Sequence, residues 1–353
     1  MNKQANFFKR LTSYKLFLPI VCLLAVLILN LIQTPNFFEI TIKNGVLYGF
    51  IIDIFNRGSG LIIMAVGMTL VIASSAGTDI SVGAVSAMAG SICVAALGTG
   101  AAYQMPYALA VLMALLAGVA CGAFNGFLVA NMRIQAMVAT LILFTAGRGI
   151  AQIATGSFIL YVKPPDFQYL GNFIPGSPIP TPCIVAFGIV LATYLILRKT
   201  SLNMFVQAVG INAKASRLVG LNPVRIQFIT YVVCGLLAAV AGLISVSRTG
   251  SADANNIGLN TELDAILAVA IGGNSLAGGR FSLAGSVIGA ITIQALTTTL
   301  YAMHIKADQI PLYKAIMVII IVALQSPEVQ RWFRNLRSKA SEKAALKEAG
   351  RNA

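Results

Sequence analysis

Hydrophobic residues fill most of this chain in long stretches that are separated by short polar breaks. A stretch of about 20 mostly apolar residues is long enough to cross the roughly 30 Å hydrocarbon core of a bilayer as a helix. The stretches that meet this criterion lie near residues 16–33, 58–75, 80–99, 106–130, 137–154, 181–197, 226–246, 262–277, 282–302 and 311–326. We therefore predict an all-α polytopic membrane protein with about ten transmembrane helices.

Three regions interrupt this pattern. Residues 34–57 mix aromatic and charged side chains, as in an interfacial stretch, and re-entrant segments could replace plain spans here and around residues 262–285. Residues 157–182 contain six prolines, which predicts a loop rather than a helix. Residues 198–225 form the largest polar connection on the inner face, opposite the face that holds residues 34–57 and 157–182. This connection is large enough to hold a docking element.

Composition and charge agree with a membrane protein and fix its orientation. Apolar residues make up 58% of the chain and charged residues 10%, whereas soluble domains carry roughly a quarter charged residues, so a soluble enzyme is excluded. Lysine and arginine gather on the side of both tails, and the positive-inside rule therefore predicts that both termini are cytoplasmic. We predict a cytoplasmic N-terminal tail (1–15), one transmembrane domain (16–326) and a basic cytoplasmic C-terminal tail (327–353).

The sequence offers little for catalysis, metal binding or nucleic-acid binding. The net charge of +14 comes largely from cations beside an apolar span, which reflects topology and not a nucleic-acid partner. There is one histidine, His304, with no CxxC pair and no GxxxxGKS/T phosphate-binding loop. Glu262 and Asp264 are two residues apart, which places them on different helix faces as a poor acid–base pair. We expect a chain that is not an enzyme and that binds no metal or other cofactor itself.

Polar residues at the ends of the predicted spans are candidates for a transport path, because ionisable groups in a membrane are costly and often mark one. The segment before residue 262 combines amides and carboxylates, which suit the paired hydrogen bonds of sugar hydroxyls. Helix capping is the alternative, by Asp79 or Ser81 for one helix and by an Asn or Thr261 for another. The candidate path residues are Asp79, Ser81, Asn125, Asp253, Asn255, Asn256, Glu262 and Asp264.

Other residues inside the predicted spans indicate how the helices pack. Arg148 lies deep in its span and is expected to pair in the interior, whereas Lys314 is close enough to an outer end to snorkel. Gly118, Gly122 and Gly126 recur every four residues, which predicts a close approach between neighbouring helices.

Three blocks of the sequence resemble one family of transport proteins. They are VGMTLVIASSAGTDISVGAVSAMAG, AVGINAKASRLVG and ADANNIGLNTELDAILAVAIGGNSLAGGRFSLAGSVIGA. Over residues 10–326 the chain resembles the permease subunits of ribose or simple-sugar importers of the ATP-binding-cassette (ABC) type. With its outer insertion from Asn36 to Asn56, it is most similar to the galactofuranose transporter permeases. It departs from the usual pattern at SSAGTD and at TTTLYAMHI, and both departures bear on the identity of the sugar.

The resemblance implies a transport protein of the bacterial inner membrane, in contact with membrane lipid and with several partner proteins. A second permease subunit would complete the path, and an extracytoplasmic binding protein would deliver galactofuranose, ribose or a similar monosaccharide. A separate ATPase subunit would use ATP and engage the coupling segment from Gly210 to Gly220. The sequence predicts a short helix there, from Asn212 to Val219, which Gly220 ends and Pro223 stops; a simple amphipathic connector is the alternative. The expected coupling residues are Gly210, Asn212, Ala215 and Gly220.

Two other classes stay open. A proton- or sodium-coupled secondary transporter would need a buried carboxylate in the middle of the membrane, whereas the predicted spans place Asp and Glu only near their ends. An integral membrane transferase that acts on a lipid-linked sugar would need clustered carboxylates or histidines at one interface. Only Asp253, Glu262 and Asp264 are candidates for such a cluster.

Overall fold

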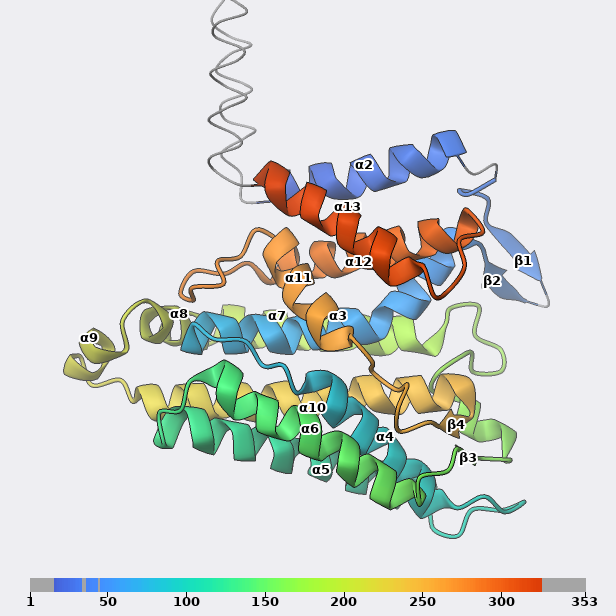
Figure 1. Ribbon diagram of the computed structural model, residues 1–353, viewed down its shortest axis with the longest axis horizontal. Helices are drawn as coiled ribbons and strands as arrows, with labels where there is room; N and C mark the ends of the chain where they lie inside the picture. The colour runs from blue at the N-terminus through green and yellow to red at the C-terminus, as the bar shows by residue number, and fades with distance from the viewer. Residues whose placement is uncertain (1–15, 34–35, 44, 326–353) are drawn as a thin grey trace, which may run out of the picture.

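The computed structural model describes residues 16–33, 36–43 and 45–325, so the predicted tails 1–15 and 327–353 lie outside the described residues. Most of the long helices run along the longest axis of the molecule (Figure 1). In chain order the helices are α2 (Phe17–Gln33), α3 (Phe50–Ser75), α4 (Val82–Leu97), α5 (Tyr107–Gly126), α6 (Ala136–Thr155), α7 (Thr181–Lys199), α8 (Leu202–Ile211), α9 (Ala213–Leu218), α10 (Pro223–Thr249), α11 (Thr261–Ile271), α12 (Leu283–Ala302) and α13 (Ile310–Gln325). A π-helical turn, η1 (Phe127–Asn131), continues α5.

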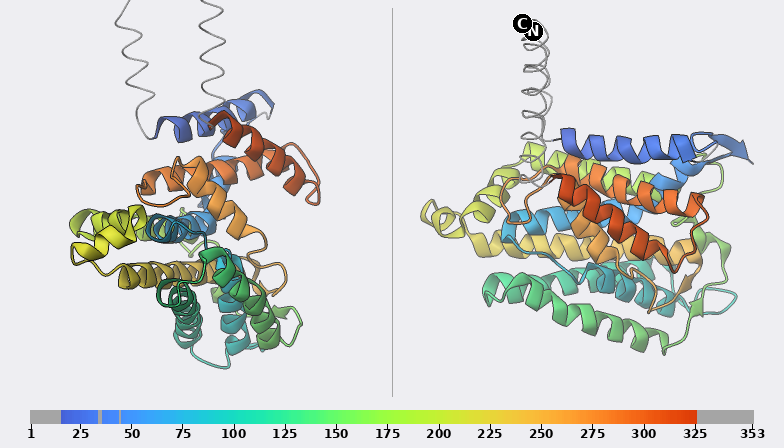
Figure 2. Two further views of the ribbon diagram at one scale, coloured as in Figure 1. Left: turned by 60° about the vertical axis from the view of Figure 1, so that its left-hand side comes forward. Right: turned by 45° about the horizontal axis from the view of Figure 1, so that its top comes forward.

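The two ends of the bundle carry different elements. At one end, which we call the α9 end, α8 and α9 project beyond the long helices (Figures 1 and 2). At the other, the hairpin end, the antiparallel strands β1 (Thr41–Lys43) and β2 (Val46–Tyr48) form a hairpin. The strands β3 (Leu160–Tyr161) and β4 (Ser251–Ala252) pair at the same end.

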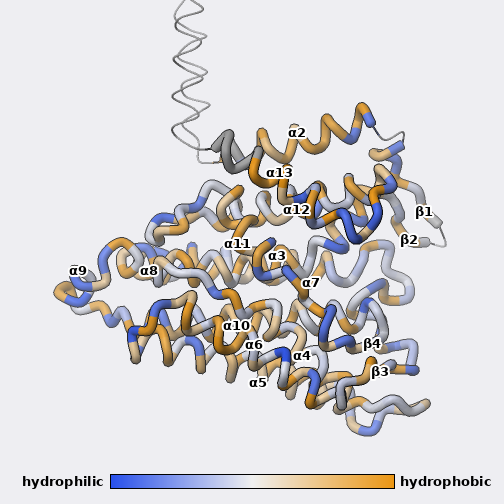
Figure 3. Tube along the Cα trace, viewed as in Figure 1, coloured by the Kyte–Doolittle hydropathy of each residue, from blue (hydrophilic) through white to orange (hydrophobic). Residues whose placement is uncertain are grey.

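Six of the described helices are long and apolar enough to cross a membrane, namely α3, α5 with η1, α6, α7, α10 and α12. The apolar helices α2, α4, α8 and α13 are shorter. Hydrophobic positions dominate the helices in Figure 3, and hydrophilic positions gather in the turns and at the helix ends. The described part of the chain is therefore mostly helical and has the composition of a membrane domain.

Helix α10 forms the centre of the bundle and packs against α3, α4 and α5. Its backbone approaches α5 closely, because a methyl group on Gly118 or Gly122 would collide with the carbonyl oxygen of Gly235 or Tyr231, respectively. The ring of Tyr231 is fully buried at this contact. The close approach predicted from the glycine spacing is confirmed.

Helix α3 begins at Phe50, eight residues before the predicted span at residue 58. The predicted span begins after the charged residues Asp53 and Arg57, but these two side chains form an i,i+4 ion pair of 2.7 Å within the helix. Because the pair neutralises itself, both charges are tolerated in the first turns of α3. The preceding residues form the β1–β2 hairpin, and among the described residues no re-entrant helix lies there.

Helix α11 is much shorter than the predicted span 262–277, which is wrong in its length. It has 11 residues, about 16 Å at the rise of an α-helix and roughly half of a bilayer core. The helix ends at Gly272, and Gly273 follows with a φ of 77°, a left-handed conformation that glycine adopts without strain. The sequence pattern missed this end because apolar residues continue up to the glycine pair.

The two predicted polar connections are present with more structure than expected. Residues 157–182 are mostly loop, as predicted, with β3 and the 3-10 helix η2 (Pro165–Tyr169) as short elements. Within 198–225 the predicted short helix is confirmed as α9, which the helix α8 precedes. The Oδ1 atom of its cap, Asn212, accepts a hydrogen bond from the Ala215 amide at 2.9 Å.

Candidate functional site

Two helices of the bundle are interrupted, and the first break, residues 76–81, lies between α3 and α4. The Ile80 amide donates to the hydroxyl of Thr140 on α6 at 3.2 Å. One turn further along, Ala84 lies against Gly147 of α6. A methyl group added to Gly147 would lie 3.3 Å from the Cβ atom of Ala84. Because both contacts are made by α6, which is long and apolar enough to span a membrane, α4 begins beside the middle of a spanning helix.

The second break, residues 250–260, precedes α11 and lies beside the first. One guanidinium nitrogen of Arg148, Nη1, donates to the backbone carbonyls of Ala254, Asn255 and Ile257, each at 3.1 Å. The backbone of Gly258 and the carboxylate of Glu262 lie so close to Gly83 that a methyl group there would collide with both. The first turns of α4 and α11 therefore meet inside the bundle.

A buried polar cluster, which we call the Asp79 cluster, lies at the first break. The amide and hydroxyl of Ser81 donate to Oδ1 of Asp79 at 2.9 and 2.6 Å. The Asn125 amide group donates to the Ser81 hydroxyl at 2.8 Å and to Asp79 at 3.5 Å. Asp79 is 2% exposed, and Asn125 Oδ1 has no hydrogen-bond partner among the described residues.

The capping alternative holds in part for this cluster. Helix α4 begins directly after Ser81, and Asp79 Oδ1 accepts a hydrogen bond from the Ser81 amide two residues on, as an N-terminal capping side chain does. The Ser81 side chain makes no capping hydrogen bond. Both side chains also bond to one another and to Asn125 of α5. The cluster thus joins the break to a neighbouring helix, which a local sequence pattern does not indicate.

At the second break, Glu262 is 3% exposed, and its Oε2 atom has no hydrogen-bond partner among the described residues. The Nε and Nη2 atoms of Arg148 are also buried and unpaired within the described part of the chain. Unpaired buried polar atoms cost about 1–3 kcal/mol each, so their gathering in one place is a costly feature of the fold. We call Arg148, Glu262 and the 254–257 carbonyls the Glu262 cluster.

The remaining predicted path residues are divided between two places. Asp253 accepts hydrogen bonds from the Asn256 side chain at 2.7 Å and from the Asn255 amide at 3.0 Å, which lowers the pKa of its carboxyl group. Asn255 Oδ1 accepts a hydrogen bond from Gln152 of α6 at 2.7 Å. These groups form an exposed turn beside the Glu262 cluster.

Asp264 belongs to neither cluster, because its carboxylate pairs with Lys314 of α13 at 2.6 Å. The expectation that Lys314 snorkels is therefore wrong, since α13 packs beside α11 and brings the two charges together. The expected separation of Glu262 and Asp264 onto different faces of a helix is confirmed. Thr261 does not cap α11; its hydroxyl donates to the Gly258 carbonyl at 2.8 Å.

The expectation that acidic residues lie only near the ends of spans is wrong for Glu262, which lies against Gly83, one residue before the contact of Ala84 with Gly147 in the middle of α6. Asp79 is also buried, but it lies level with the first turns of α6, because Gly77 packs on Ala136 and the Ile80 amide bonds to Thr140. The interior position expected for Arg148 is confirmed, although its partners are carbonyl groups. Arg148 is not among the predicted path residues. An arginine within an otherwise apolar run indicates a functional position, and this feature of the sequence would have identified it.

The predicted coupling residues separate into two environments at the α9 end. Asn212, Ala215 and Gly220 lie at the surface, next to Leu218, which is 90% exposed. Gly210 instead packs inside, where a methyl group would collide with the Ala73 carbonyl at the end of α3. The same carbonyl accepts a hydrogen bond from the Gly279 amide at 3.0 Å, so three segments meet at this point.

A cavity of about 480 Å³ connects the coupling segment with the first break. Thr78 of the break and Arg217 of α9 line opposite parts of it, together with Arg133 and Gln227. The Gln227 side chain also donates to the Ser74 carbonyl at 3.1 Å, which holds α10 to the end of α3. A movement of α9 would therefore change the walls of this cavity next to the first break.

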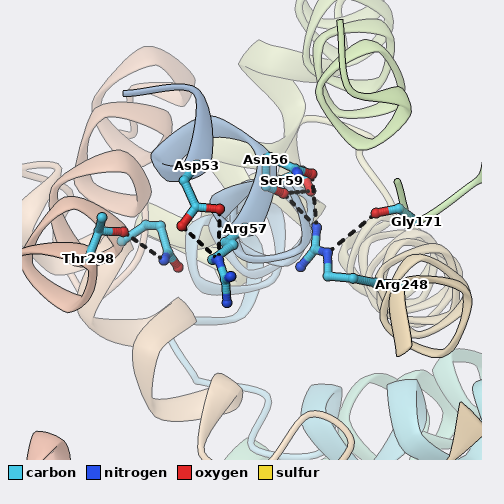
Figure 4. Close-up of polar contacts among 8 residues, drawn as sticks. Asp53, Asn56, Arg57, Ser59, Gly171, Arg248 and Thr298 are labelled. Atoms are coloured by element: carbon cyan, nitrogen blue, oxygen red, sulfur yellow. Dashed lines mark hydrogen bonds and ion pairs between the residues drawn. The ribbon is translucent and has the colours of Figure 1, made fainter. Parts of the chain in front are cut away.

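Two arginines, Arg248 and Arg57, make the main polar side-chain contacts described at the hairpin end. Arg248 of α10 donates to the Asn56 carbonyl at 2.6 Å and to the Gly171 carbonyl at 3.4 Å, and Arg57 pairs with Asp53 on the same helix (Figure 4). These contacts fix the first turns of α3 against α10 and against residues 157–182, which we call the proline-rich loop.

Comparisons with known proteins give a consistent result. The family described as the branched-chain amino acid transport system permease component matches residues 50–324. The chain is similar to the galactofuranose transporter permease of Escherichia coli, with 43% identity over 91% of this chain and 92% of that protein. It is also similar to the fructose import permease of Bifidobacterium longum, at 37% identity over 97% and 96% of the two chains. A ribose import permease of Escherichia coli is 36% identical over 87% of this chain and 92% of its own length.

Proposed function

Because this chain belongs to the family of transport-system permease components, we propose that it is the membrane-spanning subunit of a bacterial ABC importer for a monosaccharide. The observation that carries the proposal is the meeting of two interrupted helices, with unpaired polar atoms, inside an otherwise apolar bundle. The printed names of three similar permeases, for galactofuranose, fructose and ribose, support a sugar as the cargo.

The Asp79 and Glu262 clusters are the groups that the cargo passes. A neutral sugar offers hydroxyl donors and acceptors, which fit the free oxygen of Glu262, the free oxygen of Asn125 and the free nitrogens of Arg148. Transport needs contacts that are favourable enough for entry and weak enough for release. We therefore assign selectivity to an extracytoplasmic binding protein and weak, successive contacts to this chain.

The partners follow from the same proposal. A separate ATPase subunit uses ATP and engages the exposed face of α9, and a second permease subunit encloses the path. The binding protein docks at the hairpin end. Both tails and the α9 end are cytoplasmic. Of the described helices, ten are embedded in the membrane, namely the six long ones and the shorter α2, α4, α11 and α13.

We assign the coupling step to the contact between α8, α3 and the loop before α12. The backbone of α8 touches the end of α3 at Gly210, and the Ala73 carbonyl of α3 accepts from Gly279. A push on α9 is therefore passed to the segments that precede both α4 and α12. Tight backbone contacts of this kind transmit displacement because packed interiors deform little.

The buried carboxylates of Asp79 and Glu262 are the one observation that favours an ion-coupled secondary transporter. Co-purification separates the two functions directly. The permease, expressed with candidate ATPase and binding-protein genes, is expected to retain the ATPase through detergent extraction, and the sugar-loaded binding protein is expected to stimulate ATP hydrolysis. A permease that retains no ATPase and responds only to a proton gradient would contradict the ABC proposal.

A further inference from the structure

A second polar site lies at the hairpin end, away from both helix breaks. A pocket of about 650 Å³ opens between the β1–β2 hairpin, the first turns of α3 and the proline-rich loop. Its volume is within the range of about 300–1,000 Å³ that small-molecule sites occupy. The side chains that give it chemical character are Glu39, Tyr48, Asp53, Asn56, Arg57 and Phe173.

The walls of this pocket are fixed by contacts that lie behind them. Phe37, which is 1% exposed, stacks on Phe50 with ring centroids 5.2 Å apart. The Leu47 amide donates to the Pro178 carbonyl at 3.2 Å, which ties the hairpin to the proline-rich loop. The pocket is therefore built before a ligand arrives, and binding does not have to order it.

The polar groups of the pocket are held in place but not saturated. Arg57 pairs with Asp53 through Nε and its side chain remains 59% exposed, so its terminal nitrogens are available (Figure 4). Arg248 fixes the Asn56 backbone from behind, at 2.6 Å. Among the described residues, no hydrogen bond involves the Glu39 carboxylate or the Tyr48 hydroxyl.

The pocket also has an aromatic side. The rings of Tyr48 and Phe173 lie 6.1 Å apart at an angle of 42°, and both line the cavity. Aromatic faces cover the C–H groups of a sugar ring, while carboxylate, amide and guanidinium groups bond its hydroxyls. Because Asp53 is neutralised by Arg57, one free carboxylate remains, which favours a neutral polyol over an anion.

We propose that this pocket binds a neutral monosaccharide on the permease itself, through the Glu39 carboxylate, the Arg57 guanidinium and the rings of Tyr48 and Phe173. The inference rests on the proposed function, because that function makes a monosaccharide the cargo. The pocket holds the sugar at the hairpin end after delivery and before entry between the interrupted helices. It is a weak site, because it is open to solvent on one side.

The test uses the full chain in lipid nanodiscs without a binding protein, and measures saturation-transfer NMR signals from D-ribose, D-fructose and D-galactose. At least one of these sugars is expected to give a saturable signal. Glu39→Gln is expected to weaken it roughly five- to tenfold, because a hydrogen bond to a charged group is lost. Phe173→Leu, which keeps apolar bulk but removes the ring, is expected to weaken it as well.

The matched control is Asp308→Asn, which removes the same charge from an exposed position that does not line the pocket. It is expected to leave the signal unchanged. An absent signal, or a signal that Glu39→Gln does not alter, would overturn the pocket assignment. Weakened docking of the binding protein with unchanged sugar signals in Glu39→Gln would also overturn it, in favour of a protein contact.

Sugar uptake by the complete importer, compared with the nanodisc signal, separates this inference from the proposed function. If the complete importer takes up sugar with ATP while the nanodisc signal is absent, the pocket assignment fails and the transport function stands. If the complete importer takes up no sugar, the proposed function fails, and the pocket assignment that depends on it fails with it.

Discussion

Gly83 and Glu262 share one point in the bundle, since the space that Gly83 leaves open is filled by a buried carboxylate. Neither residue is unusual in the sequence, where Gly83 lies in an apolar run and Glu262 lies next to a loop. Their contact arises because two chain segments separated by almost 180 residues begin new helices, α4 and α11, at the same place inside the bundle. The size of the residue at position 83 therefore controls the geometry of the proposed path.

We predict that Gly83→Ala reduces transport and lowers the stability of the folded protein by about 1–3 kcal/mol, as overpacking of a tight core does. The added methyl group would collide with the Glu262 carboxylate and the Gly258 backbone. Thermal unfolding of the purified protein and sugar uptake measure the two effects.

Gly149→Ala is the matched control, because a methyl group at Gly149 of α6 meets no atom within 4 Å. It is expected to be neutral or to raise stability by about 0.5–1 kcal/mol, since alanine favours a helix over glycine. Equal effects of the two substitutions would contradict the tight contact at position 83.

Individual residues differ in how far their roles could be predicted. The short helix near Asn212 and the close approach at Gly118 follow from local sequence, and both are confirmed. The pairing of Lys314 with Asp264 and the joining of Asn125 to Asp79 depend on which helices become neighbours. A single sequence does not contain that information, so polar residues were located without their partners.

At the scale of elements, the hydrophobic pattern predicts which segments are helical but not where charged residues lie within them. Helix α3 continues across Asp53 and Arg57 because their charges pair, and α11 stops early because two glycines follow it. Breaks inside the membrane layer resemble ordinary loops in a hydropathy pattern. Structure is needed to find the depth at which they lie.

The contact between α8 and α3 gives a prediction at this scale. Gly210→Ala is expected to reduce the number of sugars transported per ATP hydrolysed, because a methyl group there would collide with the Ala73 carbonyl and push α8 away. Transport and ATP hydrolysis, measured in the same vesicles, give this ratio directly.

Gly220→Ala provides the comparison. A methyl group at Gly220 meets nothing within 4 Å, but its φ of 85° strains any other residue by about 1–2 kcal/mol. We expect slightly lower stability and a smaller fall in the ratio of transport to hydrolysis than in Gly210→Ala, because the added methyl group leaves the α8–α3 contact intact. An equal or smaller fall in Gly210→Ala would remove the α8–α3 contact from the coupling route.

For the whole molecule, the proposed orientation places the α9 end in the cytoplasm and the hairpin end outside. The prediction is tested with Lys214→Cys on α9 and Lys163→Cys in the proline-rich loop, both exposed, in a variant that lacks its own cysteines. In intact cells, a thiol reagent that does not cross membranes is expected to label position 163 and to leave position 214 unlabelled. Labelling of position 214 alone would invert the topology and with it the assignment of α9 to the ATPase.

The most direct test of the account is uptake of labelled pentoses and hexoses, including galactofuranose, ribose and fructose, into vesicles that hold this chain. The vesicles also contain its candidate ATPase, with the binding protein on the outer side. We predict uptake that requires ATP and all three components. Uptake that persists without the ATPase and collapses when the proton gradient is removed would contradict the central claim.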